Sequence, residues 1–167
     1  AMWRFLASLT LALLLGQAAA ADQTSPSLDS LFERLKSATD PKEAYSLEQR
    51  IWGIWIDAND ASVDRRMADG IRLMNGGEFT GSLAAFDDVV LMAPGLAEGW
   101  NKRATLYYLM GDFEASVHDI QKTLELEPRH FGALSGMGLI YSALGNDKGA
   151  LKVYERVLEI NPQKYGL

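Results

Sequence analysis

Residues 97–130, AEGWNKRATLYYLMGDFEASVHDIQKTLELEPRH, carry the pattern that decides the fold. Its main features recur every 34 residues along the chain. Three prolines show this interval, since 128 − 94 = 34 and 162 − 128 = 34. The recurring columns include Pro94, Pro128 and Pro162; Gly77, Gly111 and Gly145; Gly70, Ala104 and Gly138; and Leu73, Tyr107 and Tyr141. Self-similarity at a fixed period is typical of repeat architectures. The sequence therefore predicts three units, over residues 63–96, 97–130 and 131–164.

Each unit has the pattern of two helices. In the middle unit we expect a first helix over residues 97–109, which Gly111 ends because glycine adopts left-handed backbone angles without steric cost. A second helix over residues 113–127 stops at Pro128, which lacks the N–H that a helix interior needs. Small residues recur where two helices approach closely, and large ones recur between the pairs. The columns describe packing and predict an all-α, right-handed solenoid of antiparallel helix pairs.

The residues Trp100, Ala104, Tyr107, Gly111 and Pro128, in this spacing, resemble the tetratricopeptide repeat family over residues 63–164. The sequence departs from the family pattern at a few columns: Arg66 stands where a large apolar residue is usual, and Ser82 and Ser116 stand where alanine is commoner. Residues 98–104 and 129–134, with the Trp-rich N-terminal segment, also resemble a group of small exported alphaproteobacterial repeat proteins without an assigned activity.

Residues 28–62 are expected to form a degenerate helical hairpin that caps the array. Ser27 is the expected N-cap of its first helix, and Asp40 with Pro41 the expected start of its second. The apolar run that holds Trp52 and Trp55 has two interpretations. It covers the outer side of the first full repeat, since solenoid ends must be covered to stay soluble, or it forms a docking patch for a partner. Capping is the favoured interpretation.

The N-terminus has the order of a secretory signal peptide: a short basic start, an apolar run and a small-residue cleavage site. We assign residues 1–21 to this signal and residues 22–27 to a disordered tail. The apolar run is short for a membrane span, so no stable membrane insertion is expected after cleavage. The chain contains no cysteine that could carry a lipid anchor. A periplasmic or secreted location follows as the expectation.

Composition excludes several function classes. The formal net charge of −6, with no basic stripe, argues against nucleic-acid binding. With no cysteine and only His118 and His130 as histidines, neither a metal site nor a cofactor is expected. No phosphate-binding glycine loop and no catalytic constellation stands out, so the sequence favours a protein that is not an enzyme.

The resemblance implies that the first helix of each pair lines a concave binding face. The residues of those helices that lie off the core side form the candidate groove: Met67, Ile71, Met74, Asn75, Asn101, Lys102, Thr105, Tyr108, Leu109, Ser135, Leu139 and Ser142. Family members that hold chaperone carboxylates use several Lys, Arg and Asn residues there, and this set is missing. Asp69 and Arg103 occupy equivalent columns in adjacent repeats, and we expect them to form a partly buried structural ion pair.

Two functions remain open at this stage. The first is an extracytoplasmic scaffold or adaptor that binds a protein or peptide through the concave groove. The alternative is an accessory or regulatory subunit of a cell-envelope enzyme or assembly complex, docked through the N-terminal hairpin or the C-terminal edge. That edge follows the last repeat and exposes apolar residues such as Leu151 and Leu158. Truncation of the chain, self-association or a docked partner would account for it, and truncation is the leading interpretation.

Overall fold

The computed structural model describes residues 25–165, which form eight helices and no strand. The helices are α1 (Pro26–Ser37), α2 (Pro41–Ile56), α3 (Ala61–Asn75), α4 (Phe79–Met92), α5 (Ala97–Met110), α6 (Phe113–Leu126), α7 (Phe131–Ala143) and α8 (Asp147–Ile160). The expected signal peptide and residues 22–24 of the expected tail lie outside this range. Within it, no helix is both long and apolar enough to cross a membrane.

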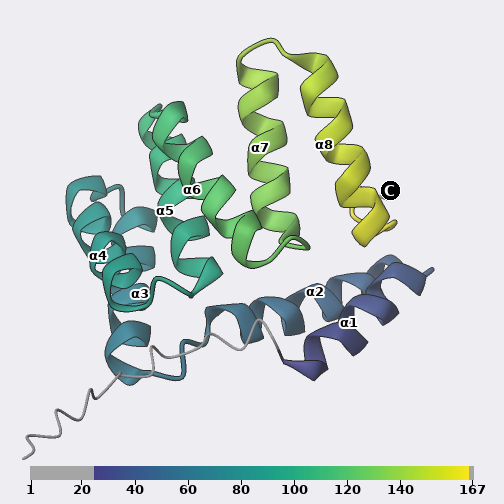
Figure 1. Ribbon diagram of the computed structural model, residues 1–167, viewed down its shortest axis with the longest axis horizontal. Helices are drawn as coiled ribbons and strands as arrows, with labels where there is room; N and C mark the ends of the chain where they lie inside the picture. Colours follow the sequence, from purple (N-terminus) through teal and green to yellow (C-terminus); the bar gives the residue numbers. More distant parts are fainter. Residues whose placement is uncertain (1–24, 166–167) are drawn as a thin grey trace, which may run out of the picture.

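The predicted array of helix pairs is confirmed: α3–α4, α5–α6 and α7–α8 pack as successive pairs (Figure 1). The turn inside the middle pair is the one that the sequence predicts, because Gly111 adopts φ 79° and closes α5. Its equivalents Gly77 and Gly145 also have positive φ, at 76° and 71°. A β-carbon is disfavoured at such angles, so this glycine column fixes where each pair turns.

The small-residue column sets how closely the two helices of a pair approach. A β-carbon built on Gly70 would lie 2.5 Å from the ring of Phe86, and one built on Gly138 would lie 2.5 Å from the ring of Tyr154. The middle repeat replaces glycine by Ala104 and places the smaller Ile120 in the matching column. The side-chain volumes at these two positions therefore compensate each other. Where the first helix has glycine, the second has an aromatic ring; where the first has alanine, the second has the smaller isoleucine.

The two serines that depart from the family pattern also stabilise the pairs. Ser82 Oγ donates a hydrogen bond to the Gly70 carbonyl oxygen (2.8 Å), and Ser116 Oγ donates one to the Ala104 carbonyl oxygen (2.7 Å). Both hydroxyls are buried, where an unpaired polar group would be costly. The same bond thus joins the helices of two successive pairs.

The N-terminal hairpin α1–α2 does not cap the outer side of the first full repeat, so this expectation is wrong. Figure 1 shows both helices lying across the ends of α5–α8, on the side of the loops that connect successive repeats. One core cluster joins Leu35, Ile51 and Trp55 of the hairpin to Phe131 of α7 and Val157 of α8. We call α1–α2 the strap, because it runs along the array instead of stacking at its end.

Polar contacts also hold the strap on this edge. Glu48 Oε1 accepts a hydrogen bond from Asn161 Nδ2 at 2.8 Å, and Glu48 Oε2 accepts one from Lys164 Nζ at 3.0 Å. Arg129, in the loop before α7, pairs with Asp29 of α1 at 2.7 Å, and its guanidinium lies over the ring of Phe32. Most apolar residues of the strap are buried in a cluster that includes Phe131 and Val157 of the array, so the strap is part of the core.

The start of α1 differs from the sequence expectation. The helix begins at Pro26, and the hydroxyl of Ser25 accepts a hydrogen bond from the Ser27 backbone N–H, so Ser25 is the N-cap rather than Ser27. The reason is Pro26, which suits the first turn of a helix because it has no N–H to lose. Residues 26 and 27 are therefore helical and do not belong to the expected tail. Asp40 caps α2 as predicted, with Pro41 in its first turn.

Two glycine-to-alanine substitutions test the packing account. We expect Gly70→Ala to destabilise the protein by about 1–3 kcal/mol, because the new methyl meets Phe86. Gly53→Ala on α2 meets nothing within 4 Å and should stabilise the protein by about 0.5–1 kcal/mol. Urea unfolding measures both. Adding Phe86→Ile to Gly70→Ala recreates the pairing of the middle repeat and should recover part of the loss; no recovery would contradict the volume compensation.

Candidate functional site

The concave side of the array contains a groove between α5 and α7. A cavity of about 170 Å³ lies there, and five residues of the sequence-predicted groove line it: Asn101, Thr105, Tyr108, Ser135 and Leu139. Its remaining lining residues are Ala104, Ser116, Ile120, Gly132 and Gly136. None of the ten side chains is charged. We call this cavity the α5–α7 groove.

Local packing sets the shape of the α5–α7 groove. The ring of Tyr108 stacks on Phe113 at 5.6 Å, which orients it along the groove wall. Thr105 Oγ1 donates a hydrogen bond to the Asn101 carbonyl oxygen (3.0 Å), a contact within α5 that leaves the threonine methyl group on the helix surface. A β-carbon on Gly136 would lie 3.5 Å from Ile120. The absence of a side chain at Gly136 therefore leaves space above Ile120 in the groove. The groove offers apolar surface with a few hydroxyl and amide groups.

The other residues of the predicted groove do not join this cavity. Met67 and Ile71 line a second cavity of about 370 Å³ on α3, together with Ile56 and Asp57 at the end of the strap. Met74 is half-buried on α3, and Asn75 is exposed at its end. Leu109 and Ser142 are exposed in the last turns of α5 and α7. The structure therefore divides the predicted face into the α5–α7 groove, a second, larger cavity beside α3 and isolated surface positions.

Two predicted groove residues border a cavity but are themselves buried. Met67 is 1% exposed within the core of the first repeat, and Asn101 is 5% exposed. The physical reason is the strap, because Ile56 and Ala58 pack with Met67, and Trp52 reaches the first turns of α5. Lys102 also turns away from the groove. Its ammonium lies 3.1 Å from Glu98 Oε1 and over the ring of Trp52.

A buried polar cluster lies between the strap and the array, and the sequence analysis missed it. Glu98 and His130 are both 0% exposed, with His130 Nε2 2.8 Å from Glu98 Oε2. Asn101 Nδ2 donates a further hydrogen bond to the same carboxylate oxygen at 3.2 Å. His130 lies in the column of Leu96, a fully buried residue, since 96 + 34 = 130. This equivalence could have revealed the cluster from the sequence. A histidine in a buried apolar column is itself expected to be buried, and a buried histidine needs a hydrogen-bond partner.

The contacts of His130 define its protonation pattern. Its Nδ1 accepts a hydrogen bond from the Ala133 backbone N–H at 3.1 Å, which makes His130 the N-cap of α7. The proton of the neutral ring therefore sits on Nε2 and is donated to Glu98. Burial alone raises the pKa of Glu98, but the hydrogen bond that His130 donates and the neighbouring ammonium of Lys102 outweigh it. The pKa of Glu98 is lowered below its ordinary value of 4.5.

The proposed docking patch of Trp52 and Trp55 is occupied inside the molecule, so that interpretation is wrong. Trp55 is 1% exposed and its ring stacks on His130 at 4.1 Å with an interplanar angle of 11°. Trp52 is half-buried and meets His130 and Phe131 edge-on. Both tryptophans belong to the contact between the strap and α7.

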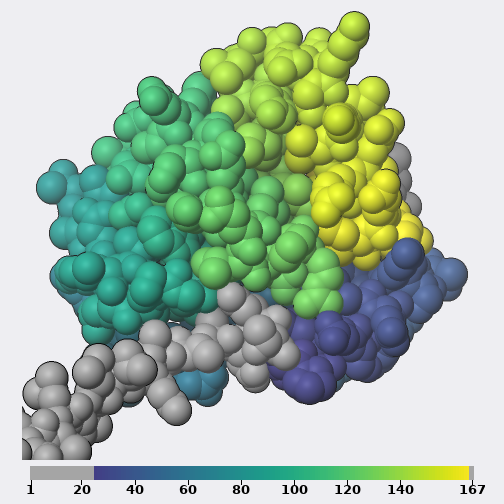
Figure 2. Space-filling model, viewed as in Figure 1, coloured from purple at the N-terminus to yellow at the C-terminus, as the bar shows by residue number. Residues whose placement is uncertain are grey.

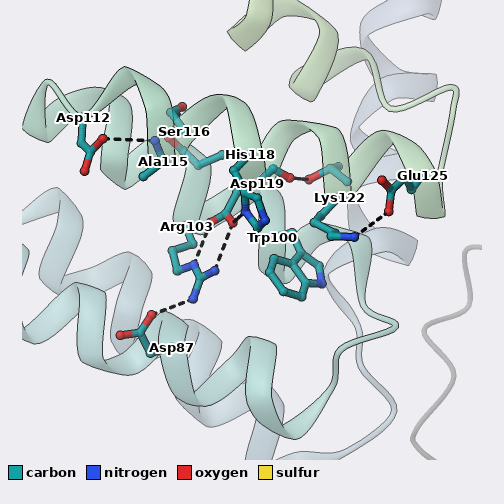
Figure 3. A network of polar contacts seen from close by, with 12 residues as sticks. Asp87, Trp100, Arg103, Asp112, Ala115, Ser116, His118, Asp119, Lys122 and Glu125 are labelled. Carbon is teal, nitrogen blue, oxygen red and sulfur yellow. Dashed lines mark hydrogen bonds and ion pairs between the residues drawn. The ribbon is translucent and has the colours of Figure 1, made fainter.

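The expected ion pair between Asp69 and Arg103 is also wrong. Figure 3 shows Arg103 reaching Asp119 on α6 and Asp87 on α4. Its Nε and Nη2 atoms bind the two oxygens of Asp119 at 2.7 and 3.0 Å, and its Nη1 lies 2.8 Å from Asp87 Oδ1. Arg103 therefore points toward α6 of its own pair and α4 of the preceding pair. Asp69, its equivalent on α3, instead lies 3.7 Å from the exposed Arg72. Buried Asp119 therefore holds Arg103 within its own repeat, and Asp87 links Arg103 to the preceding repeat.

These contacts give Arg103 a structural role. Hydrogen bonding to Asp119 raises the pKa of Arg103 above its ordinary value, so the guanidinium is a fixed cation. Exposed His118 lies 3.0 Å from the same aspartate, through Nδ1. Among residues 25–165, no group of three or more His, Cys, Asp or Glu side chains is arranged to hold a metal ion.

Comparison with known proteins identifies the repeats. The tetratricopeptide repeat family matches residues 97–130 and 131–164. A repeat-containing protein of Rhizobium etli is 41% identical over 135 residues, which cover 81% of this chain and 66% of that protein. A tetratricopeptide repeat protein 36 homolog of Nematostella vectensis is 32% identical over 110 residues, 64% of this chain and 59% of its own length. The chain thus spans just under two thirds of the first relative and a smaller part of the second.

Solved structures show the same fold. The tetratricopeptide domain of Sgt2 from Aspergillus fumigatus superposes with a TM-score of 0.57 at 23% identity, over 60% of this chain and 67% of that one. The MamA crystal structure gives a TM-score of 0.57 at 18% identity, over 87% of this chain and 85% of that one. At these identities, the likeness concerns the fold alone.

Acid titration tests the buried Glu98–His130 pair. Because the pKa of Glu98 is lower in the folded protein, its stabilisation is complete above the ordinary value of 4.5 and is lost as the pH falls below it. We expect Glu98→Gln to lower the free energy of unfolding at pH 7 by about 1–3 kcal/mol. The difference from the parent protein should shrink as the pH falls below about 4.5 in urea unfolding. Glu159→Gln, at an exposed position on α8, is the control; a difference for Glu98→Gln that stays constant into acid contradicts the account.

Proposed function

Because this chain belongs to the tetratricopeptide repeat family, whose members generally act as protein-interaction scaffolds, we propose that it binds a protein or peptide partner and catalyses no reaction. The α5–α7 groove is the proposed binding surface. The observation that carries this choice is the convergence of Thr105, Tyr108, Ser135 and Leu139 from two successive repeats on one open cavity.

The chemistry of the groove indicates the kind of partner. All ten lining residues are uncharged. Lys102, the one basic residue of the sequence-predicted groove, is paired with buried Glu98. An anchored carboxylate needs positively charged donors. The Hsp70–Hsp90 organizing protein of wheat, 26% identical over 104 residues, is a relative whose name refers to chaperones. We propose instead a neutral segment for this chain, held by apolar contacts and by hydrogen bonds to hydroxyl and amide groups.

The location of this activity is part of the proposal. The order of charged, apolar and small residues at the N-terminus supports export to the periplasm or secretion. N-terminal sequencing of protein recovered from the periplasm or medium tests it, with cleavage after Ala20 or Ala21 as the expected result. Retention of the uncleaved N-terminus in the cytoplasm would contradict export. Docking of an envelope enzyme through Trp52 and Trp55 is not proposed, because the array already covers them.

Selection from a displayed library of random peptides tests the groove. We expect the selected peptides to be rich in apolar and uncharged polar residues. Leu139→Glu and Tyr108→Ala should each raise the dissociation constant about tenfold or more, since apolar and aromatic contacts dominate binding energy. Leu91→Glu is the matched control, because Leu91 is 80% exposed on α4, outside the groove. Selected peptides that depend on a free carboxylate, or that bind both groove variants as tightly as the parent, would contradict the proposal.

A further inference from the structure

The outer side of α8 carries an apolar seam. Leu151 is 61% exposed and Leu158 is 39% exposed, with half-buried Tyr154 between them. The spacings of three and four residues place all three side chains on one side of the helix. Figure 1 shows α8 at the end of the array, farthest from α3–α4. A cavity of about 440 Å³, lined by Leu139, Tyr154 and Tyr165 among others, extends this apolar surface.

Earlier repeats cover the residues of these same columns with another helix. Leu158 is equivalent to Val90, which is 7% exposed beneath the start of α5, and Tyr154 is equivalent to Ile120, which is 2% exposed beneath α7. Between the described pairs, these two residues are therefore packed against the next helix. On α8, the described contact over the seam is the ring of Tyr165, 5.7 Å from that of Tyr154, and it leaves Leu151 and Leu158 exposed.

The charges beside the seam indicate which helix covers it. Lys148 and Lys152 lie in the first half of α8, and Glu155 and Glu159 lie in its second half, all on one flank of the seam. None of the four takes part in an ion pair with another described residue. A helix with this pattern is complementary to an antiparallel copy of itself, because each pair of lysines then faces a pair of glutamates.

We propose that two copies of this chain associate through α8, packed antiparallel about a twofold axis that passes near Tyr154 and Glu155. In this arrangement Leu151 of one copy meets Leu158 of the second copy, and the apolar seam is buried. The contact uses the same surface on both copies, as in most symmetric dimers, so it closes on itself and builds no fibre. Leu151 and Leu158 do not line the α5–α7 groove, although the cavity beside the seam shares Ser135 and Leu139 with it.

Sedimentation equilibrium of the protein measures the association. The parent protein should be dimeric at about 50 μM, a concentration that detects even micromolar affinity. Leu151→Glu and Leu158→Glu should each give a monomer with an unchanged circular dichroism spectrum. The control Leu91→Glu places the same charge on an exposed leucine of α4 and should stay dimeric. A monomeric parent protein, or a dimer that survives both α8 substitutions, overturns the proposal.

Charge reversal tests the antiparallel pairing itself. Lys152→Glu alone and Glu159→Lys alone should each weaken the dimer about tenfold, since a twofold contact doubles every like-charge pair. Reversing all four charges together (Lys148→Glu, Lys152→Glu, Glu155→Lys and Glu159→Lys) restores complementarity and should regain the parent affinity; a fourfold variant weaker than both single ones contradicts the pairing. The chain has no cysteine, so Glu155→Cys, next to the axis, should form a disulfide-linked dimer on oxidation, whereas Gln121→Cys on α6 should not. Failure of Glu155→Cys to crosslink overturns the antiparallel geometry.

Discussion

The hydrogen bond between His130 and Glu98, covered by the ring of Trp55, is the contact on which the arrangement of the molecule depends. It joins the first helix of the middle repeat to the start of the last repeat and to the strap at one point. A buried carboxylate without its partners would be costly, so this point tolerates little change. Figure 2 shows the strap and the array as one continuous body.

This contact also decides which surfaces remain available. The strap covers the edge where successive repeats connect and buries the first turns of the concave helices, including Met67 and Asn101. The open part of the concave face lies further along α5 and α7, around Tyr108 and Leu139. The uncharged character of the groove follows from the same arrangement, because Lys102 pairs with Glu98 instead of facing a ligand.

The sequence predicted what local packing determines. Columns such as Gly70 with Phe86 recur every repeat because each helix pair meets the same steric constraint, so the period reveals the repeats without knowledge of their partners. The strap has no such period, and its position depends on contacts between residues far apart, such as Glu48 with Asn161. The direction of Arg103 and the packing of Trp55 on His130 were missed for that reason. Five residues of the candidate groove were identified because the period places them on facing helices.

A crystal structure of the protein with a selected peptide tests the central claim most directly, namely that the strap leaves the α5–α7 groove as the binding surface. The account predicts the peptide between α5 and α7, in contact with Tyr108 and Leu139, and the strap in place with Trp55 stacked on His130. A peptide bound in the position of α2, with the strap displaced, or bound along α8, would contradict it.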